Sequence, residues 1–225
     1  MTISTPKPES PLTPYFPVPT KDTSKQAPKE EAPQIDAVIN ALKMLPHIEG
    51  GYYAETDRDP RLVPSPFPDT PSSPDFFQRQ GFNPSHRNAS TTIYYLITPN
   101  SPQGNFHRNR ARTVHTLHRG RGRYVLIHAD EEGKEKRVES FVVGLDVARG
   151  EKPQWIVEGG KYKASYLLPD VEGGEGGGEA SGWLLISETV VPGFEFFDHD
   201  FLTKSGLKEL VGEEKAAELD WLARE

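Results

Sequence analysis

Residues 106–120, FHRNRARTVHTLHRG, bring histidines and arginines close together, and three of the seven histidines of the chain lie there. If residues 106–113 form a strand, alternate side chains point to opposite sides. His107, Asn109 and Thr113 then share one face, and the three intervening arginines share the other with Phe106. Arginines in a row cannot line a dry interior without anions. We therefore expect the histidine face to point into an interior and most of the basic charge to point outward.

A histidine in such a position is suited to proton transfer. A neutral imidazole in a partly buried pocket can remove a proton from a carbon next to a carbonyl group, because its pKa lies near neutral pH. The alternative is that His107 is a hydrogen-bonded residue of the core. His115 could join His107 on the inner face, whereas His118 and His128 are interpreted as structural or surface groups.

The elements that position these residues are predominantly strands. Between residues 90 and 198, short runs rich in β-branched and aromatic residues are separated by glycine, proline or charged turns, which predicts a sandwich or barrel. The runs are 91–97, 113–118, 123–129, 138–144, 154–158, 162–168 and 182–190. Residues 34–45 and 203–224 instead space their apolar residues as amphipathic helices do.

Three segments do not fit this pattern. Residues 1–33 contain eight prolines and almost no large apolar residues, which predicts a disordered tail. Residues 57–88 are a proline-rich insertion that we interpret as a surface loop, either a lid or binding segment or a tolerated insertion. Residues 172–181 are glycine-rich and predict a flexible loop. We expect residues 34–225 to form a single domain.

The composition excludes several classes of function. The chain has no cysteine, so it has neither disulfides nor thiolate metal sites, which fits a cytoplasmic location. No apolar run approaches 18 residues, so we expect no membrane span. The net charge of −7 argues against a nucleic-acid partner, because nonspecific binding to nucleic acid needs a basic surface.

Four stretches resemble a known family. They are LPHIEGGYYAET (45–56), RNASTTIYYLI (87–97), GEKPQWIVEGGKYKAS (150–165) and ETVVPGFEFFDHDFL (188–202). Together with the histidine strand they resemble the cupin superfamily. More narrowly, they resemble its small members of largely unknown function that are close in structure to dTDP-4-dehydrorhamnose epimerase. The resemblance spans about residues 45–222. It implies a mainly β fold, the double-stranded β-helix or jelly roll, a homodimer, and a small-molecule ligand in a cavity between the sheets.

The resemblance also says where a metal would bind. Metal-binding cupins use His-x-His, then a glutamate, then a later histidine. Here His107 occupies the first position, Asn109 the second and Thr113 the carboxylate position, while the last falls near Tyr162 or Lys163. A stable site needs about three protein ligands. We therefore expect no metal cofactor.

The epimerase relatives are understood to pair a histidine base with a tyrosine acid on the opposite face of the sugar. The resemblance thus implies His107 as the base and a tyrosine as the acid. The tyrosines that could supply it are Tyr52, Tyr53, Tyr94, Tyr95 and Tyr162, of which we take Tyr94 as the candidate. Strand alternation allows only one of Tyr94 and Tyr95 to face inward. The candidate ligand-binding residues are Glu49, Tyr52, Asn109, Thr113, His115, Tyr162 and Phe194. The aromatic ring of Phe194 either belongs to the core or stacks on a ligand ring.

The chain departs from its relatives over residues 112–116, RTVHT, where they have an acidic pair followed by Trp-His. Three functions stay open. The first is a metal-independent epimerase or isomerase acting on a small carbonyl or sugar-type metabolite. The second is a small-molecule-binding cupin without catalysis, which the missing acid and histidine favour. The third is a metal-dependent cupin oxygenase.

Overall fold

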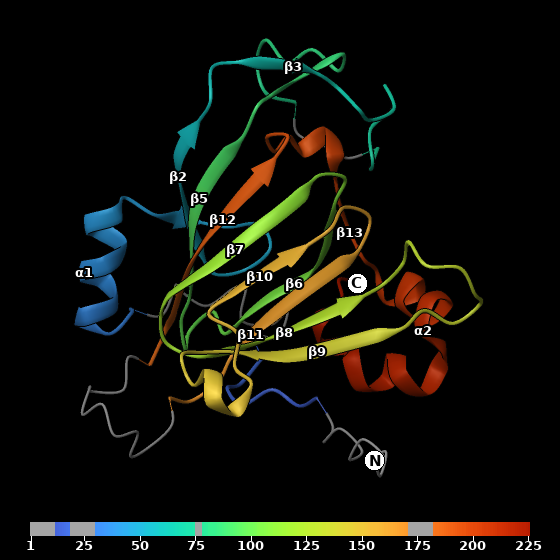
Figure 1. The fold of residues 1–225 in the computed structure, drawn as a ribbon. Coiled ribbons are helices and arrows are strands. Elements are labelled where there is room, and N and C mark those ends of the chain that lie inside the picture. Colours follow the sequence, from blue (N-terminus) through green and yellow to red (C-terminus); the bar gives the residue numbers. More distant parts are fainter. Residues whose placement is uncertain (1–11, 19–29, 75–77, 171–181) are drawn as a thin grey trace.

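Two antiparallel sheets face each other in the computed structural model, which describes residues 12–18, 30–74, 78–170 and 182–225 (Figure 1). One sheet has the strand order β1-β2-β5-β12-β7-β10, formed by Leu45–Pro46, Tyr52–Arg58, Thr91–Ile97, Leu184–Val191, Arg112–Arg119 and Gln154–Val157. The other has the order β13-β6-β11-β8-β9, formed by His199–Phe201, Gln103–Asn109, Tyr162–Leu167, Gly122–Ile127 and Val138–Val143. The prediction of a mainly β jelly roll is confirmed.

One helix covers the outer face of each sheet. Helix α1, Pro33–Leu42, begins with a proline, which its first turn tolerates, and buries Ile35 against Leu96 and Trp183 of the six-stranded sheet. Helix α2, Lys204–Leu219, buries four of its side chains against the five-stranded sheet, including Leu207 and Leu219. The predicted terminal helices are therefore confirmed.

The apolar core between the sheets fills only part of the sandwich. Alternate residues of β12 are buried, starting with Leu184 and Ile186, as period-two side-chain alternation requires. These side chains pack with Tyr124, Phe141 and Trp155. Farther along the same strand, the inward position is taken by Glu188. The interior is thus apolar at one end and polar toward the other.

Residues 106–113 do not form one continuous strand, contrary to the prediction. β6 ends at Asn109 and β7 begins at Arg112, and the two strands belong to different sheets. The chain crosses between the sheets at this point, and the backbone N–H of Arg110 donates to the carbonyl of Asp198. His107 and Thr113 therefore face the interior from opposite sheets.

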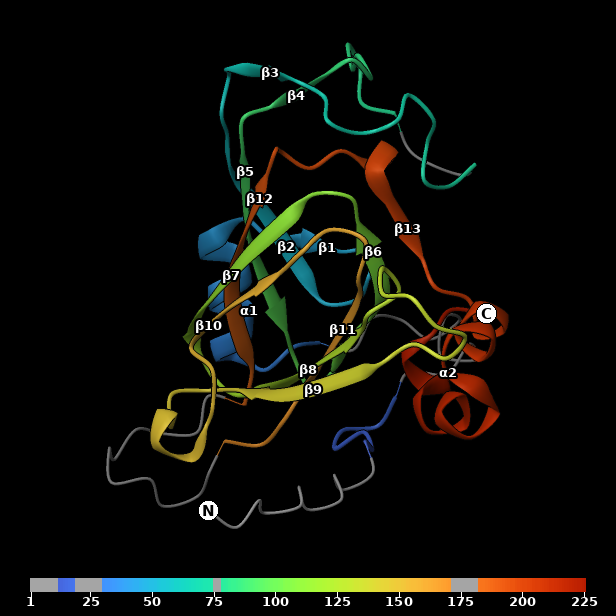
Figure 2. The ribbon, with the colours of Figure 1, turned by 45° about the vertical axis from the view of Figure 1, so that its right-hand side comes forward.

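The insertion, here called the arm (residues 59–88), is more ordered than a surface loop. Strands β3 (Leu62–Pro64) and β4 (His86–Asn88) pair within it, and the arm extends past the ends of β5 and β12 (Figure 2). Its base is fixed by Arg87, whose fully buried guanidinium makes two hydrogen bonds to Asp198, of 2.6 and 2.9 Å. The proline-rich composition of this segment shows no strand pattern, so sequence analysis did not predict the pairing of β3 and β4.

The described parts of the N-terminal segment also pack on the domain, unlike the disordered tail that we expected. Leu12 is buried in the core beside α2, and its N–H donates to Glu218. Glu31 is buried and accepts a hydrogen bond from Thr98. The glycine-rich loop predicted over 172–181 lies outside the described residues. No helix in the described part of the chain is long and apolar enough to cross a membrane.

Candidate functional site

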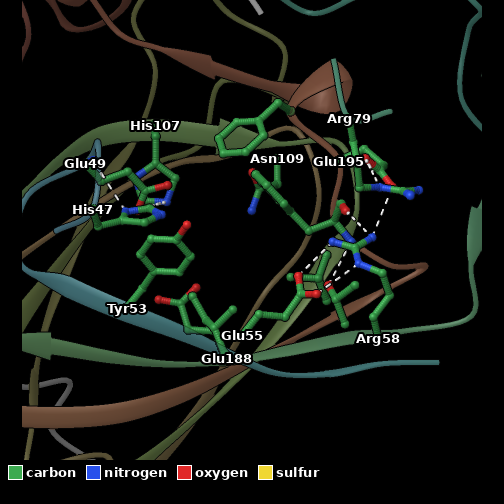
Figure 3. Close-up of a pocket in the computed structure, with 15 residues that line it drawn as sticks. His47, Glu49, Tyr53, Glu55, Arg58, Arg79, His107, Asn109, Glu188 and Glu195 are labelled. Carbon is green, nitrogen blue, oxygen red and sulfur yellow. Dashed lines mark hydrogen bonds and ion pairs between the residues drawn. The ribbon is translucent and has the colours of Figure 1, made fainter. Parts of the chain in front are cut away.

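A cavity of about 320 Å³ lies between the sheets at the end covered by the arm (Figure 3). Its wall combines side chains from β2, β5, β6 and β12 with the turn after β1, the arm and the segment after β12. Ile93, Val190, Phe194 and Phe196 supply its apolar surface. Two groups of charged residues flank this surface, one around Glu49 and one around Glu195.

Three histidines surround Glu49. The Nε2 atom of His199 lies 3.1 Å from one carboxylate oxygen, and the Nε2 atom of His107 lies 3.3 Å from the other. The Nδ1 atom of His47 lies 3.5 Å from the same oxygen as His107. Burial alone would raise the pKa of Glu49, but the nearby histidines outweigh it and hold that pKa well below its usual range. Glu49 is therefore a carboxylate at neutral pH.

Both ring nitrogens of His107 have a neighbour, the Asn105 carbonyl at Nδ1 and the Glu49 carboxylate at Nε2. Its Nδ1 lies 2.9 Å from the carbonyl oxygen of Asn105, and a carbonyl only accepts, so Nδ1 carries the hydrogen. Burial lowers the pKa of His107 to about 3, although the charge of Glu49 opposes this shift. The imidazole is neutral at neutral pH. Its Nε2 lone pair can accept a proton, and Glu49 would stabilise the imidazolium that results.

Two glycines hold Glu49 in place. Gly50 and Gly51 have φ of +110° and +68°, a backbone conformation that disfavours other residues. A Cβ atom on Gly50 would lie 2.1 Å from the carbonyl oxygen of Gln103, so the turn packs directly against β6. The hydroxyl of Tyr95 donates to the carbonyl of Gly50, at 2.9 Å. The HIEGGYY stretch therefore brings Glu49 to His107.

A buried ion pair forms the inner boundary of the cavity. The ammonium of Lys163 lies 2.6 Å from Glu188 and 3.0 Å from Nε2 of His115. Burial alone would raise the pKa of Glu188, but Lys163 and His115 outweigh it and hold that pKa well below its usual range. Burial also lowers the pKa of His115. Of these three residues, Glu188 lines the cavity wall.

The second charged group joins the arm to the sandwich. Arg79 of the arm and Arg58 of β2 both contact Glu195, with nitrogen–oxygen distances of 2.8 and 3.0 Å. Arg58 also makes an ion pair with Glu55, at 2.8 Å. Each of these charged side chains therefore has a partner, and the arm supplies part of the cavity wall.

Two polar side chains in the wall remain available to a ligand. Tyr53 extends from β2, and its hydroxyl points into the cavity on the side of the histidines (Figure 3). Asn109 lines the same cavity, and its Oδ1 atom is buried without a hydrogen-bond partner among the described residues. Unsatisfied buried polar atoms are uncommon, so a ligand donor at Asn109 would be favourable.

The structure brings together some of the predicted site residues. Glu49, His107, Asn109 and Phe194 all line the cavity. Thr113 and His115 are buried but lie outside the cavity wall, because β7 lies beyond β12 in the sheet, on the side away from β2 and β5.

Three predicted tyrosines face away from the cavity. Tyr52 and Tyr94 pack beneath α1, on the outer face of the six-stranded sheet. Tyr162 packs toward α2, and its hydroxyl donates to Asp200. The neighbours Tyr53 and Tyr95 point inward instead and are paired across β2 and β5. Because side chains alternate along each strand, the structure places the predicted acid Tyr94 and the predicted ligand-binding residues Tyr52 and Tyr162 outside the cavity wall.

Sequence analysis missed several residues of the site. They are His47, Glu55, Arg58, Arg79 and Glu188 in the wall, and Lys163 behind it, while Tyr53 was one of several candidate acids but was not chosen. His47 and Tyr53 flank the Glu-Gly-Gly stretch, so their position in HIEGGYY was a usable signal. Glu188 is a charged residue at an inward position of an otherwise apolar strand, which was a second signal. Nothing in the pattern of the insertion indicated Arg79.

The residues do not fit the metal that some cupins hold. Lys163 lies opposite His107 in the pairing of β6 and β11, and its ammonium fills the interior between Glu188 and His115. The histidines near Glu49 contact a carboxylate rather than converge on an empty centre. Within the described ranges, no group of three or more histidine, aspartate and glutamate side chains could hold a metal ion.

The jelly roll and its internal cavity define a cupin. The chain belongs to the family described as Cupin superfamily (DUF985), whose model matches residues 36–202. It is 46% identical over 200 residues to the uncharacterized protein YML079W of Saccharomyces cerevisiae, covering 88% of this chain and 90% of the relative.

Two solved structures are similar to the whole domain. A hypothetical protein from Leishmania major matches with a TM-score of 0.64 and 29% identity, over 87% of this chain and all of that one. Protein SO0799 from Shewanella oneidensis matches with a TM-score of 0.59 and 23% identity, over 84% of this chain and 96% of that one. The second likeness shows the fold alone.

Proposed function

We propose that this cupin is a metal-independent epimerase or isomerase that acts on a small carbonyl-bearing metabolite. One observation carries the proposal: His107 lines the cavity, is neutral, has Nδ1 bonded to Asn105, and has Nε2 3.3 Å from the carboxylate of Glu49. The neutral imidazole is the form that accepts a proton, and the carboxylate offsets part of the burial that disfavours its protonated form. The cavity of about 320 Å³ suits a small metabolite.

In the proposed reaction, His107 Nε2 takes a proton from the carbon next to the carbonyl. The electrons of the broken C–H bond move to the carbonyl oxygen and form an enolate. Tyr53 takes the role that sequence analysis gave to Tyr94 and donates its hydroxyl proton to the same carbon. His107 then loses its proton to solvent and Tyr53 regains one, so the enzyme returns to its starting state. Asn109 is available to bind a polar group of the substrate.

Solvent exchange tests this proposal. The protein is incubated in D₂O with small ketones such as hydroxyacetone and dihydroxyacetone, while proton NMR follows loss of the signal next to the carbonyl. Saturation-transfer NMR records in parallel which of these compounds bind. We expect bound ketones to exchange faster than in buffer. His107→Gln and Tyr53→Phe should each remove at least about 99% of the excess rate, within the range of acid–base catalysis. Tyr94→Phe, on the outer face of the sheet, should retain it.

A small-molecule-binding cupin without catalysis is the second candidate. It is favoured by the charged residues of the described wall, which are all paired already, and by Thr113 and Thr116 standing where relatives have an acid and a histidine. Binding of the ketones without exchange in the wild-type protein would support this candidate and contradict the epimerase.

A further inference from the structure

A second cavity, of about 430 Å³, lies between β9 and β10. These are the last strands of the five-stranded and six-stranded sheets, so each has one edge without a strand partner among the described residues (Figure 2). The two edges meet at a bridge between Val143 and Lys152, where the N–H of Lys152 donates to Val142. The sandwich is therefore open beyond this bridge. The cavity there shares no lining residue with the one near His107.

The floor of this second cavity is aromatic and largely buried. Phe141 and Trp155 meet edge to face, with ring centroids 6.2 Å apart, and Leu126 lies beside them. Such a surface favours a planar apolar ligand. The Nε1 atom of Trp155 is buried without a hydrogen-bond partner among the described residues. A ligand acceptor that reached it would remove an unfavourable buried donor.

The rim carries a lysine, Lys152, whose contact with a carboxylate is long. The ammonium of Lys152 lies 3.9 Å from the centroid of the Phe141 ring, and the distance between this ammonium and the carboxylate of Glu139 is 3.7 Å. Glu139 is already shared with His128 at 3.1 Å and with Arg137 at 3.4 Å. Lys152 is thus held over the aromatic floor with little of its charge compensated.

We infer that this cavity is a second binding site, which takes a flat aromatic anion. The ring packs against Trp155 and Leu126 beside Phe141, and the carboxylate pairs with Lys152, which covers the Phe141 ring. The inference goes beyond the proposed function, because it uses none of the residues around His107 and requires no catalysis.

The probe is 2-naphthoate, with the uncharged 2-naphthamide as its matched partner, and binding is measured by isothermal titration calorimetry. We expect naphthoate to bind in the millimolar range or tighter and naphthamide to bind about tenfold more weakly. Lys152→Gln should weaken naphthoate binding about tenfold, because an ion pair over an apolar floor is lost. Trp155→Phe should also weaken it. Lys208→Gln removes the same charge from the exposed side of α2 and should leave the affinity unchanged.

Three results would overturn the inference. They are no binding of naphthoate in the millimolar range, equal affinity for naphthoate and naphthamide, and unchanged affinity in Lys152→Gln. Loss of naphthoate binding in Asn109→Ala would instead locate the ligand in the first cavity and would equally contradict a second site. Because Asn109 does not line the second cavity, retained affinity in that variant supports the inference whatever becomes of the proposed epimerase.

Discussion

The ammonium of Lys163 donates to the carboxylate of Glu188 across the interior of the sandwich, with Nζ 2.6 Å from Oε2 and both side chains buried. One residue stands on β11 and the other on β12, so the pair connects the two sheets directly. Desolvation of two buried charges is unfavourable, and their attraction offsets it only while both are present.

Removing one partner of this pair should therefore lower the free energy of unfolding much more than removing both. Lys163→Met leaves Glu188 without its closest cation and should lower the free energy of unfolding by about 3–5 kcal/mol. The double variant Lys163→Met, Glu188→Leu should recover most of that loss. Urea denaturation measures both. Equal losses in the single and double variants would show that packing, rather than charge, dominates here.

The stability of the protein should decline in mild acid. His107 has a pKa of about 3 in the native state against an ordinary value of 6.5, so between these values the unfolded chain binds a proton that the native chain does not. The contribution of His107 to the free energy of unfolding is therefore complete above pH 6.5, and it is lost as the pH falls toward 3. The lowered pKa of His115 acts in the same direction.

Replacing His107 isolates its share of this pH dependence. Between about pH 5 and 6, His107→Gln should reduce the slope of unfolding free energy against pH by about 1.4 kcal/mol per pH unit, the value for one proton. Denaturant titrations at several pH values measure the slope, whatever the variant does to absolute stability. An unchanged slope would mean that His107 is already protonated in the native protein.

Gly50, in the turn that carries Glu49, should not tolerate replacement by a residue with a side chain. Gly50→Ala places a Cβ atom 2.1 Å from a backbone oxygen of β6 in addition to requiring positive φ. Gly150→Ala is the matched control, because Gly150 also has positive φ, of +85°, but no atom within 4 Å of the added Cβ. The control should lose about 1–2 kcal/mol. Thermal unfolding should show a clearly larger loss for Gly50→Ala, and similar losses would refute the close contact.

The arm should depend on the exact shape of the Arg87 side chain. Lysine cannot reproduce two parallel hydrogen bonds to Asp198, so Arg87→Lys should destabilise the buried base of the arm by about 2–4 kcal/mol. Arg61→Lys alters a similar pair with Asp59, but Arg61 is 80% exposed, and its effect should be below about 0.5 kcal/mol. Chemical denaturation compares the two. Comparable effects would mean that burial of Arg87 contributes little.

The fold could be predicted from the sequence because its signals are local. Runs such as residues 91–97 and 162–168 are rich in β-branched and aromatic residues between turns, and they correspond to β5 and β11 almost residue for residue. The short strands β3 and β13 have three residues each, too few for a pattern. The end of β6 was missed because the crossing between sheets leaves the local polarity unchanged.

The site was only partly predictable because strand alternation gives relative faces, not absolute ones. It places Tyr52 and Tyr53 on opposite sides, and likewise Tyr94 and Tyr95, but the choice of inner side depends on where α1 packs. The same ambiguity applied to Tyr162, which faces α2 while its neighbour faces the interior. Arg79 reaches the cavity only through the tertiary fold of the arm.

The cavity wall combines residues of an inserted segment with residues of the two sheets. Arg79 belongs to an insertion, whereas His107 and Glu188 stand on strands of the two sheets. Under the proposed function, changes in the length or sequence of this segment would alter the part of the cavity wall that contains Arg79, while the interior groups keep their geometry. Exchanging this segment between family members would be a direct way to redirect selectivity without rebuilding the barrel.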